Sequence, residues 1–105
     1  MDSRELREMA ARAAGFEVNV AKGGGSWIND GSKIWPKWNP IDDDGDALRL
    51  ALKIGISIEV IPAHDSVMAH VDNEHFSFSA TEALDSFGAR QAIIRVAAEI
   101  GRGMK

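Results

Sequence analysis

The stretch ISIEVIPAHDSVMAHVDNEHFSFSA, residues 56–80, decides the fold of this chain. Three short segments in it alternate apolar and polar residues with a period of two: residues 56–60, 67–71 and 76–79. This period is typical of strands that bury one face. Pro62 ends the first strand, and turn-forming residues at 72–74 make residues 66–80 a predicted hairpin. Strands with such short connections cannot be parallel neighbours, so the stretch predicts an antiparallel sheet.

Helical patterns flank this sheet on both sides. Apolar residues recur at helical spacing in residues 3–14, about 43–54 and about 87–101. Residues 16–20 alternate with a period of two and add a fourth strand. The order of elements predicts an α+β fold, with one antiparallel sheet of about four strands and three helices packed on it. The alanine-rich stripes of the first and last helices can pack within the chain or between copies.

Length and composition bound the kind of protein. A chain of 105 residues is long enough for one hydrophobic core, so we expect a single domain over residues 1–105. Its sequence has no cysteine, which removes disulfides and thiolate chemistry and fits a reducing compartment. A formal net charge of −4 opposes the phosphate backbone, so duplex nucleic acid is not an expected partner. Charges in the first five residues and the lack of a long apolar run favour a cytoplasmic protein without membrane contact.

All three tryptophans fall in one irregular segment, residues 21–40. Long irregular segments in small domains are commonly binding loops, and indole faces can stack on a planar base while ammonium groups pair with phosphate. The segment therefore predicts a site for a nucleotide-like ligand. Its candidate residues are Trp27, Lys33, Trp35, Lys37, Trp38 and Lys22. The alternative is that the indoles close one end of the core, which is the commoner role of tryptophan. A short hairpin inside this segment, around residues 28–35, is also compatible with its turn residues.

Two clusters of titratable residues have simpler structural explanations. Asp42, Asp43, Asp44 and Asp46 precede a helix, where carboxylates cap backbone N–H groups, and Arg49 can pair with Asp46. The spacing does not match a calcium loop. His64, His70 and His75 match no zinc motif, and His70 and His75 are expected opposite each other on the solvent side of the hairpin. The sequence thus predicts no catalytic residue, no metal and no cofactor.

Four segments carry a resemblance to a known group of proteins. They are Trp38-Asn39-Pro40, residues 43–51, Ile56-Ser57-Ile58 and residues 89–101. Together they resemble small uncharacterised bacteriophage and prophage proteins grouped as a phage ABA-sandwich domain. The resemblance implies an N-terminal helix, a central helix after an aromatic-rich loop, a meander and a C-terminal helix. It also implies a viral origin and localisation in the cytoplasm of an infected bacterial host. It assigns no catalytic residues to this chain.

Three functions follow as expectations. The first is a non-enzymatic phage accessory protein, with a role in counter-defence, that sequesters a nucleotide-derived small molecule; oligomerisation could build its pocket from two chains. The second is an inhibitor or adaptor that docks on a host protein, because tryptophan and arginine are favoured interface anchors. The third is a hydrolase that uses the histidines on a nucleotide signal.

Overall fold

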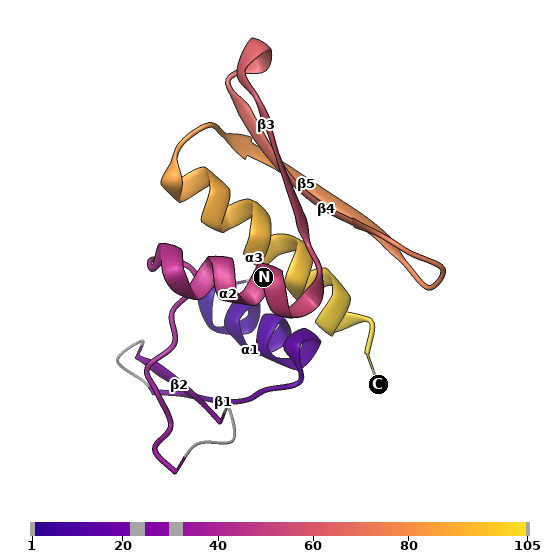
Figure 1. Cartoon of the computed structure of the whole chain (residues 1–105). Helices are drawn as coiled ribbons and strands as arrows, with labels where there is room; N and C mark the ends of the chain where they lie inside the picture. Colours follow the sequence, from indigo (N-terminus) through magenta and orange to yellow (C-terminus); the bar gives the residue numbers. More distant parts are fainter. Residues whose placement is uncertain (1, 22–24, 30–32, 105) are drawn as a thin grey trace.

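Three helices and two antiparallel sheets form an α+β fold in the computed structural model, which describes residues 2–21, 25–29 and 33–104 (Figure 1). The elements in chain order are α1 (Ser3–Ala14), β1 (Glu17–Val20), β2 (Ser26–Asn29), α2 (Asp44–Ile54), β3 (Ser57–Ile61), the 3-10 turn η1 (Pro62–His64), β4 (Ser66–Asp72), β5 (Ser77–Ala83) and α3 (Ser86–Arg102). The strand order in the larger sheet is β3-β4-β5, as the alternation in residues 56–80 predicts.

The elements are stacked in layers. Helix α3 packs on β4 and β5 with one side and on α1 and α2 with the other. The β1–β2 hairpin packs against α1, so it lies at the end of the molecule away from the three-stranded sheet (Figure 1). The core between these layers consists mainly of aliphatic side chains, of which Leu50, Ile94 and Val96 are the largest that are fully buried.

The prediction of a single four-stranded sheet was wrong. Strand β1 pairs with β2, in the register Glu17↔Asn29 to Val20↔Ser26, and forms a separate two-stranded sheet. Its alternating pattern correctly indicates a strand with one covered face, but that face packs on α1. A period of two reports only that one face is covered, and a helix covers a strand face as well as a sheet does.

The predicted helix ends are confirmed by their caps. Asp2 accepts a hydrogen bond from the Glu5 backbone N–H over 2.8 Å, and Asp43 accepts one from Asp46 over 2.9 Å. At the other ends, Gly15 and Gly55 adopt positive φ angles of 79° and 91°, which glycine adopts without a steric penalty. Capping of α2 is therefore confirmed for Asp43, whereas Asp44 pairs with Arg90.

Small residues let α1 and α3 approach closely. Ala10 and Ala11 of α1 and Ala97 and Ala98 of α3 are all fully buried. At Gly101 a Cβ atom would lie 1.7 Å from the carbonyl oxygen of Met9, so the two backbones are in direct contact. The alanine-rich stripes thus pack within the chain.

Candidate functional site

Backbone hydrogen bonds fasten the tryptophan-bearing loop to β2. Trp27 and Lys37 form an isolated antiparallel bridge. On either side of it, the Ile28 N–H donates to the Pro36 carbonyl over 3.1 Å and the Trp38 N–H donates to the Ser26 carbonyl over 2.8 Å. Residues 36–38 therefore run antiparallel beside β2, slightly later in the sequence than the hairpin expected around residues 28–35. The arrangement brings Trp27, Lys37 and Trp38 together.

A buried polar contact holds the base of this loop. The Ser26 hydroxyl donates to the Trp38 carbonyl and accepts a hydrogen bond from the Arg7 guanidinium over 3.4 Å. Arg7 and Ser26 are both buried, so these contacts are shielded from water. They connect α1, β2 and the returning loop, and they fix the start of the segment that leads to α2.

The three indoles have different surroundings. Trp38 is only 4% exposed and belongs to the hydrophobic core, together with Ile28 and Leu50. Trp27 is half-buried, and its ring lies over Gly25, where an added Cβ would be 3.1 Å from the ring. Trp35 is 37% exposed. Core closure therefore describes Trp38, whereas Trp27 and Trp35 keep part of their ring surface exposed.

An open hollow of about 500 Å³ lies between the loop and the start of α2. It is lined by Gly25, Ser26, Trp27, Lys37, Trp38, Asn39, Asp42, Asp43 and Asp46. A second hollow, of about 360 Å³, shares Lys37, Trp38 and Asp46 with the first and extends to Phe16, Arg49 and Leu50. We call the first of these the tryptophan hollow.

The carboxylates of the tryptophan hollow are held in place by hydrogen bonds. Asp46 accepts from the Asn39 backbone N–H over 2.9 Å with one oxygen and from the Arg49 guanidinium over 2.7 Å with the other. The hydrogen bond to Asp46 is the main cause that raises the pKa of Arg49 above its ordinary value. Asp42 accepts from the Asn39 side-chain amide over 3.0 Å. An ionised carboxylate offers about four acceptor positions, so these groups keep acceptor capacity beyond the hydrogen bonds named here.

Lys37 supplies positive charge at the same hollow. Its side chain is exposed, and within residues 2–21, 25–29 and 33–104 its ammonium group forms no hydrogen bond or ion pair. A ligand anion can therefore approach it without displacing a protein partner. The hollow thus combines a half-exposed indole, one ammonium group and several carboxylate oxygens.

The predicted site residues are only partly brought together. Trp27, Lys37 and Trp38 line the tryptophan hollow, whereas Lys33 and Trp35 do not, and Lys22 lies outside the described residues. The acidic residues were expected as caps, with Asp46 also as the partner of Arg49, and their role as part of the lining was missed. A cap is recognisable from sequence because it precedes a helix, but the direction of its unused lone pairs depends on the tertiary fold.

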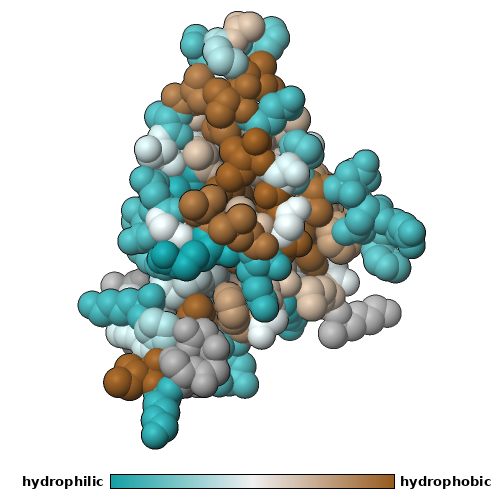
Figure 2. Space-filling model, in the orientation of Figure 1, coloured by the Kyte–Doolittle hydropathy of each residue, from teal (hydrophilic) through white to brown (hydrophobic). Residues whose placement is uncertain are grey.

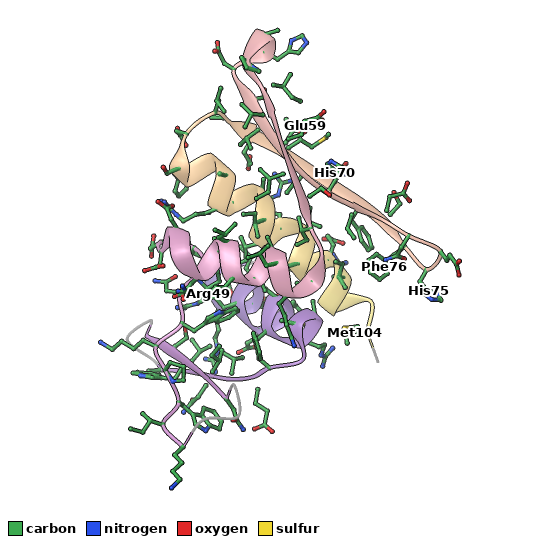
Figure 3. All side chains as sticks on the ribbon, viewed as in Figure 1. Arg49, Glu59, His70, His75, Phe76 and Met104 are labelled. Carbon is green, nitrogen blue, oxygen red and sulfur yellow. The ribbon has the colours of Figure 1, made fainter. Side chains whose placement is uncertain are left out.

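The histidines lie apart from this hollow. His64 ends η1, His70 lies in the middle of β4 and His75 lies near the tip of the β4–β5 hairpin (Figure 3). His70 pairs with Ser79, so its expected position opposite His75 was wrong. The connection is longer than the tight turn that such a pairing requires. In the described part of the chain, no group of three or more His, Cys, Asp or Glu residues could hold a metal ion.

Comparison with family models, with curated proteins and with solved structures found no match for this chain. Among the helices of the described residues, none has both the length and the apolar character that crossing a bilayer requires.

Proposed function

We propose that this chain is a non-enzymatic phage accessory protein that captures a nucleotide-derived small molecule in the tryptophan hollow. The observation that carries the proposal is the half-buried Trp27 ring beside the Lys37 ammonium group, which has no hydrogen-bond or ion-pair partner among the described residues. An indole face suits stacking on a planar base, and an ammonium group suits a phosphate. The viral origin rests on the resemblance of its sequence to small phage proteins, and a role in counter-defence rests on the small size of the chain and on its aromatic and lysine-bearing loop.

The carboxylates impose an orientation on such a ligand. Asp42, Asp43 and Asp46 repel a phosphate, so the phosphate has to lie toward Lys37 and the base toward the start of α2. Carboxylates accept hydrogen bonds, and the base best suited to them presents adjacent N–H donors. Guanine has this donor edge in its ring N–H and its amino group. A guanine nucleotide with few phosphate charges is accordingly the ligand that we propose.

Capture fits this hollow better than turnover. The three histidines, which are the candidates for a general base near neutral pH, lie on η1 and the larger sheet, on the other side of α3 from the loop. A hydrolase acting through them would have to bind its substrate elsewhere. Incubation of a bound nucleotide with the protein, with and without zinc, should leave it intact.

Replacing Trp27 by alanine should weaken nucleotide binding by about 10- to 100-fold, which corresponds to the loss of one base-stacking contact. Lys37→Ala should weaken it less, and the loss should shrink as salt is added, because the contact is electrostatic. Isothermal titration calorimetry with guanosine and adenosine monophosphates, cyclic dinucleotides and cyclic ADP-ribose measures both effects.

Trp35→Ala is the matched control for this experiment, because it removes an indole of the same loop that does not line the hollow. It should bind as the unmodified protein does. Absence of heat with every nucleotide at millimolar concentration would refute the proposal. Equal losses for Trp27→Ala and Trp35→Ala would also contradict it, because they would place the ligand outside the tryptophan hollow.

Docking on a host protein is a second candidate, and the exposed pair Ile34 and Trp35 favours it. Ile34 is 82% exposed, and an adjacent aliphatic and aromatic pair at a loop surface is typical of an interface anchor. We expect a host partner at equal stoichiometry to be retained by Trp27→Ala and lost with the double variant Ile34→Ser, Trp35→Ser. Co-purification from host lysate followed by native mass spectrometry tests this; retention by both variants rules the pair out.

A further inference from the structure

Strand β3 is an edge strand without a neighbour on one side. It pairs with β4 only, in the register Ser57↔His70 to Ile61↔Ser66. Within the residues that the structure describes, the backbone groups on its other side have no hydrogen-bond partner. Such a row of N–H and C=O groups is a template for a further strand.

The side of β3 that faces the helices is apolar but uncovered. Ile58 and Val60 stand beside the buried Ala69 and Val67 of β4, on the same face of the sheet. Yet Ile58 is 41% and Val60 57% exposed, because α3 packs on β4 and β5 and leaves β3 almost bare. The β3–β4 hairpin also projects past the helices (Figure 1). The core face of the sheet is therefore incomplete at this edge.

This edge also lacks the usual protection against strand pairing. Residues 57–61 contain no lysine and no proline, and Glu59 is their only charge. The opposite edge, β5, has the sequence Ser-Phe-Ser-Ala-Thr-Glu-Ala at residues 77–83, and its outward positions are polar or small. Figure 2 shows apolar side chains gathered in a band over β3 toward α2. We call Ile58, Val60 and the backbone edge of residues 57–61 the β3 patch.

We propose that the β3 patch binds a second copy of this chain, with the two β3 strands paired antiparallel about a two-fold axis at Glu59. Each Ile58 then lies opposite Val60 of the second copy, and each Ser57 opposite Ile61. The two three-stranded sheets become one six-stranded sheet. A two-fold interface of this kind is self-complementary, because the same strand supplies both halves.

The register follows from parity and length. The two-fold axis is perpendicular to the sheet, and each residue of one strand faces a residue of the other. The core faces of the two sheets lie on the same side only if the two residue numbers of each such pair have an even sum. The axis must then pass at a residue, and residues 58, 59 and 60 are the candidates. Centring on residue 58 or 60 pairs three residues of each strand, and centring on residue 60 also places Ile58 opposite Pro62, which has no N–H. Centring on Glu59 pairs all five. It sets two carboxylates face to face, but these lie on the solvent side, where repulsion is screened.

The size of the patch sets the expected affinity. Two half-exposed aliphatic side chains, Ile58 and Val60, and a five-residue edge of about 17 Å cover less than the roughly 800 Å² that each partner contributes to a standard interface. We therefore expect a dissociation constant in the micromolar range. Sedimentation velocity between about 1 and 200 µM should show a monomer–dimer equilibrium; a chain that stays monomeric at 200 µM overturns the proposal.

Single cysteines test the register directly, because the natural sequence has none. Glu59→Cys should form a disulfide-linked dimer under mild oxidation, since directly opposed residues lie about 4.5–5.5 Å apart between Cα atoms. Ile58→Cys and Val60→Cys should not cross-link alone, but a mixture of the two should. Thr81→Cys, in the same row on the β5 edge, is the control. Cross-linking of Ile58→Cys, Val60→Cys or Thr81→Cys alone, without Glu59→Cys, overturns the proposal.

Charge variants test the same contact without oxidation. Val60→Lys should abolish dimers up to 200 µM while thermal unfolding of the monomer hardly changes, because Val60 is already exposed in the single chain. Thr81→Lys should leave the dimer unchanged. Glu59→Gln removes the like-charge pair and should tighten the dimer severalfold, by up to about fivefold. A Glu59→Gln variant that dimerises more weakly than the unmodified chain contradicts a two-fold axis at Glu59.

Discussion

Gly101→Ala should lower the free energy of unfolding by at least about 3 kcal/mol, a large part of the roughly 5–15 kcal/mol that stabilises a small domain. A Cβ atom at this position would lie 1.7 Å from the Met9 carbonyl oxygen and 2.6 Å from the carbonyl carbon. Both atoms are backbone, so no side-chain rotation can relieve the overlap. The helices would have to separate, and the surrounding Ala10, Ala97 and Ala98 would lose their contacts. Urea denaturation followed by circular dichroism measures the loss.

Gly103→Ala provides the matched control at the end of the same helix. The nearest atom to a Cβ there is the Ile100 carbonyl oxygen at 3.6 Å, which is an ordinary contact, and the residue has φ −80°. Its stability should stay within about 0.5 kcal/mol of the unmodified chain, as for most surface substitutions. If the two variants unfold at the same urea concentration, α1 and α3 do not touch through their backbones as described.

Helix positions could be predicted because each helix has local signals at its ends. Asp2 and the acidic run 42–46 supply carboxylates that satisfy free N–H groups, and Gly15 and Gly55 supply the left-handed residue that ends a helix. These signals act over four or five residues and do not depend on the rest of the fold. The contact between Met9 and Gly101 depends on two helices that are far apart in the sequence, and nothing local marks it.

The partner of a strand was harder to predict than the strand itself. The alternation in β1 is visible in the sequence, but its partner β2 has four residues, beside a run of glycines and without a clear period. The three strands of residues 56–80 were predictable because short connections restrict them to pairing with one another. The pairing of β1 was misassigned because its loop is long enough to permit either choice.

In the candidate site, residue composition predicted which residues lie near one another, but the geometry of the loop could not be predicted. The clustering of indoles and lysines in the sequence predicts that they lie close together, and Trp27, Lys37 and Trp38 do line the same hollow. The separation of Trp35 from them follows from the two backbone hydrogen bonds that join residues 36 and 38 to β2. These bonds fix the phase of the returning strand, and no side-chain pattern in the loop reveals that phase.

Trp38→Ala should cost about 3–5 kcal/mol of stability, the range measured for large buried aromatic residues. The indole is 4% exposed and belongs to the same core as Ile28 and Leu50, so its removal leaves a cavity under the loop. Hydrogen bonds to Ser26, Ile28 and Asp46 also attach the described part of the loop. We therefore expect the loop to detach and nucleotide binding to fall as well, although the stacking surface of Trp27 remains. Chemical denaturation followed by circular dichroism gives the first effect and calorimetry the second.

Trp35→Ala again serves as the control, because it removes an indole of equal size from an exposed position. This variant should lose less than about 1 kcal/mol in its free energy of unfolding. The loss for Trp38→Ala should therefore be at least about three times as large. Equal stability of the two would mean that Trp38 does not anchor the loop. The tryptophan hollow would then have no rigid floor, and a ligand would have to order the loop on binding, at a cost in affinity of about 0.5–1.5 kcal/mol for each side chain that it immobilises.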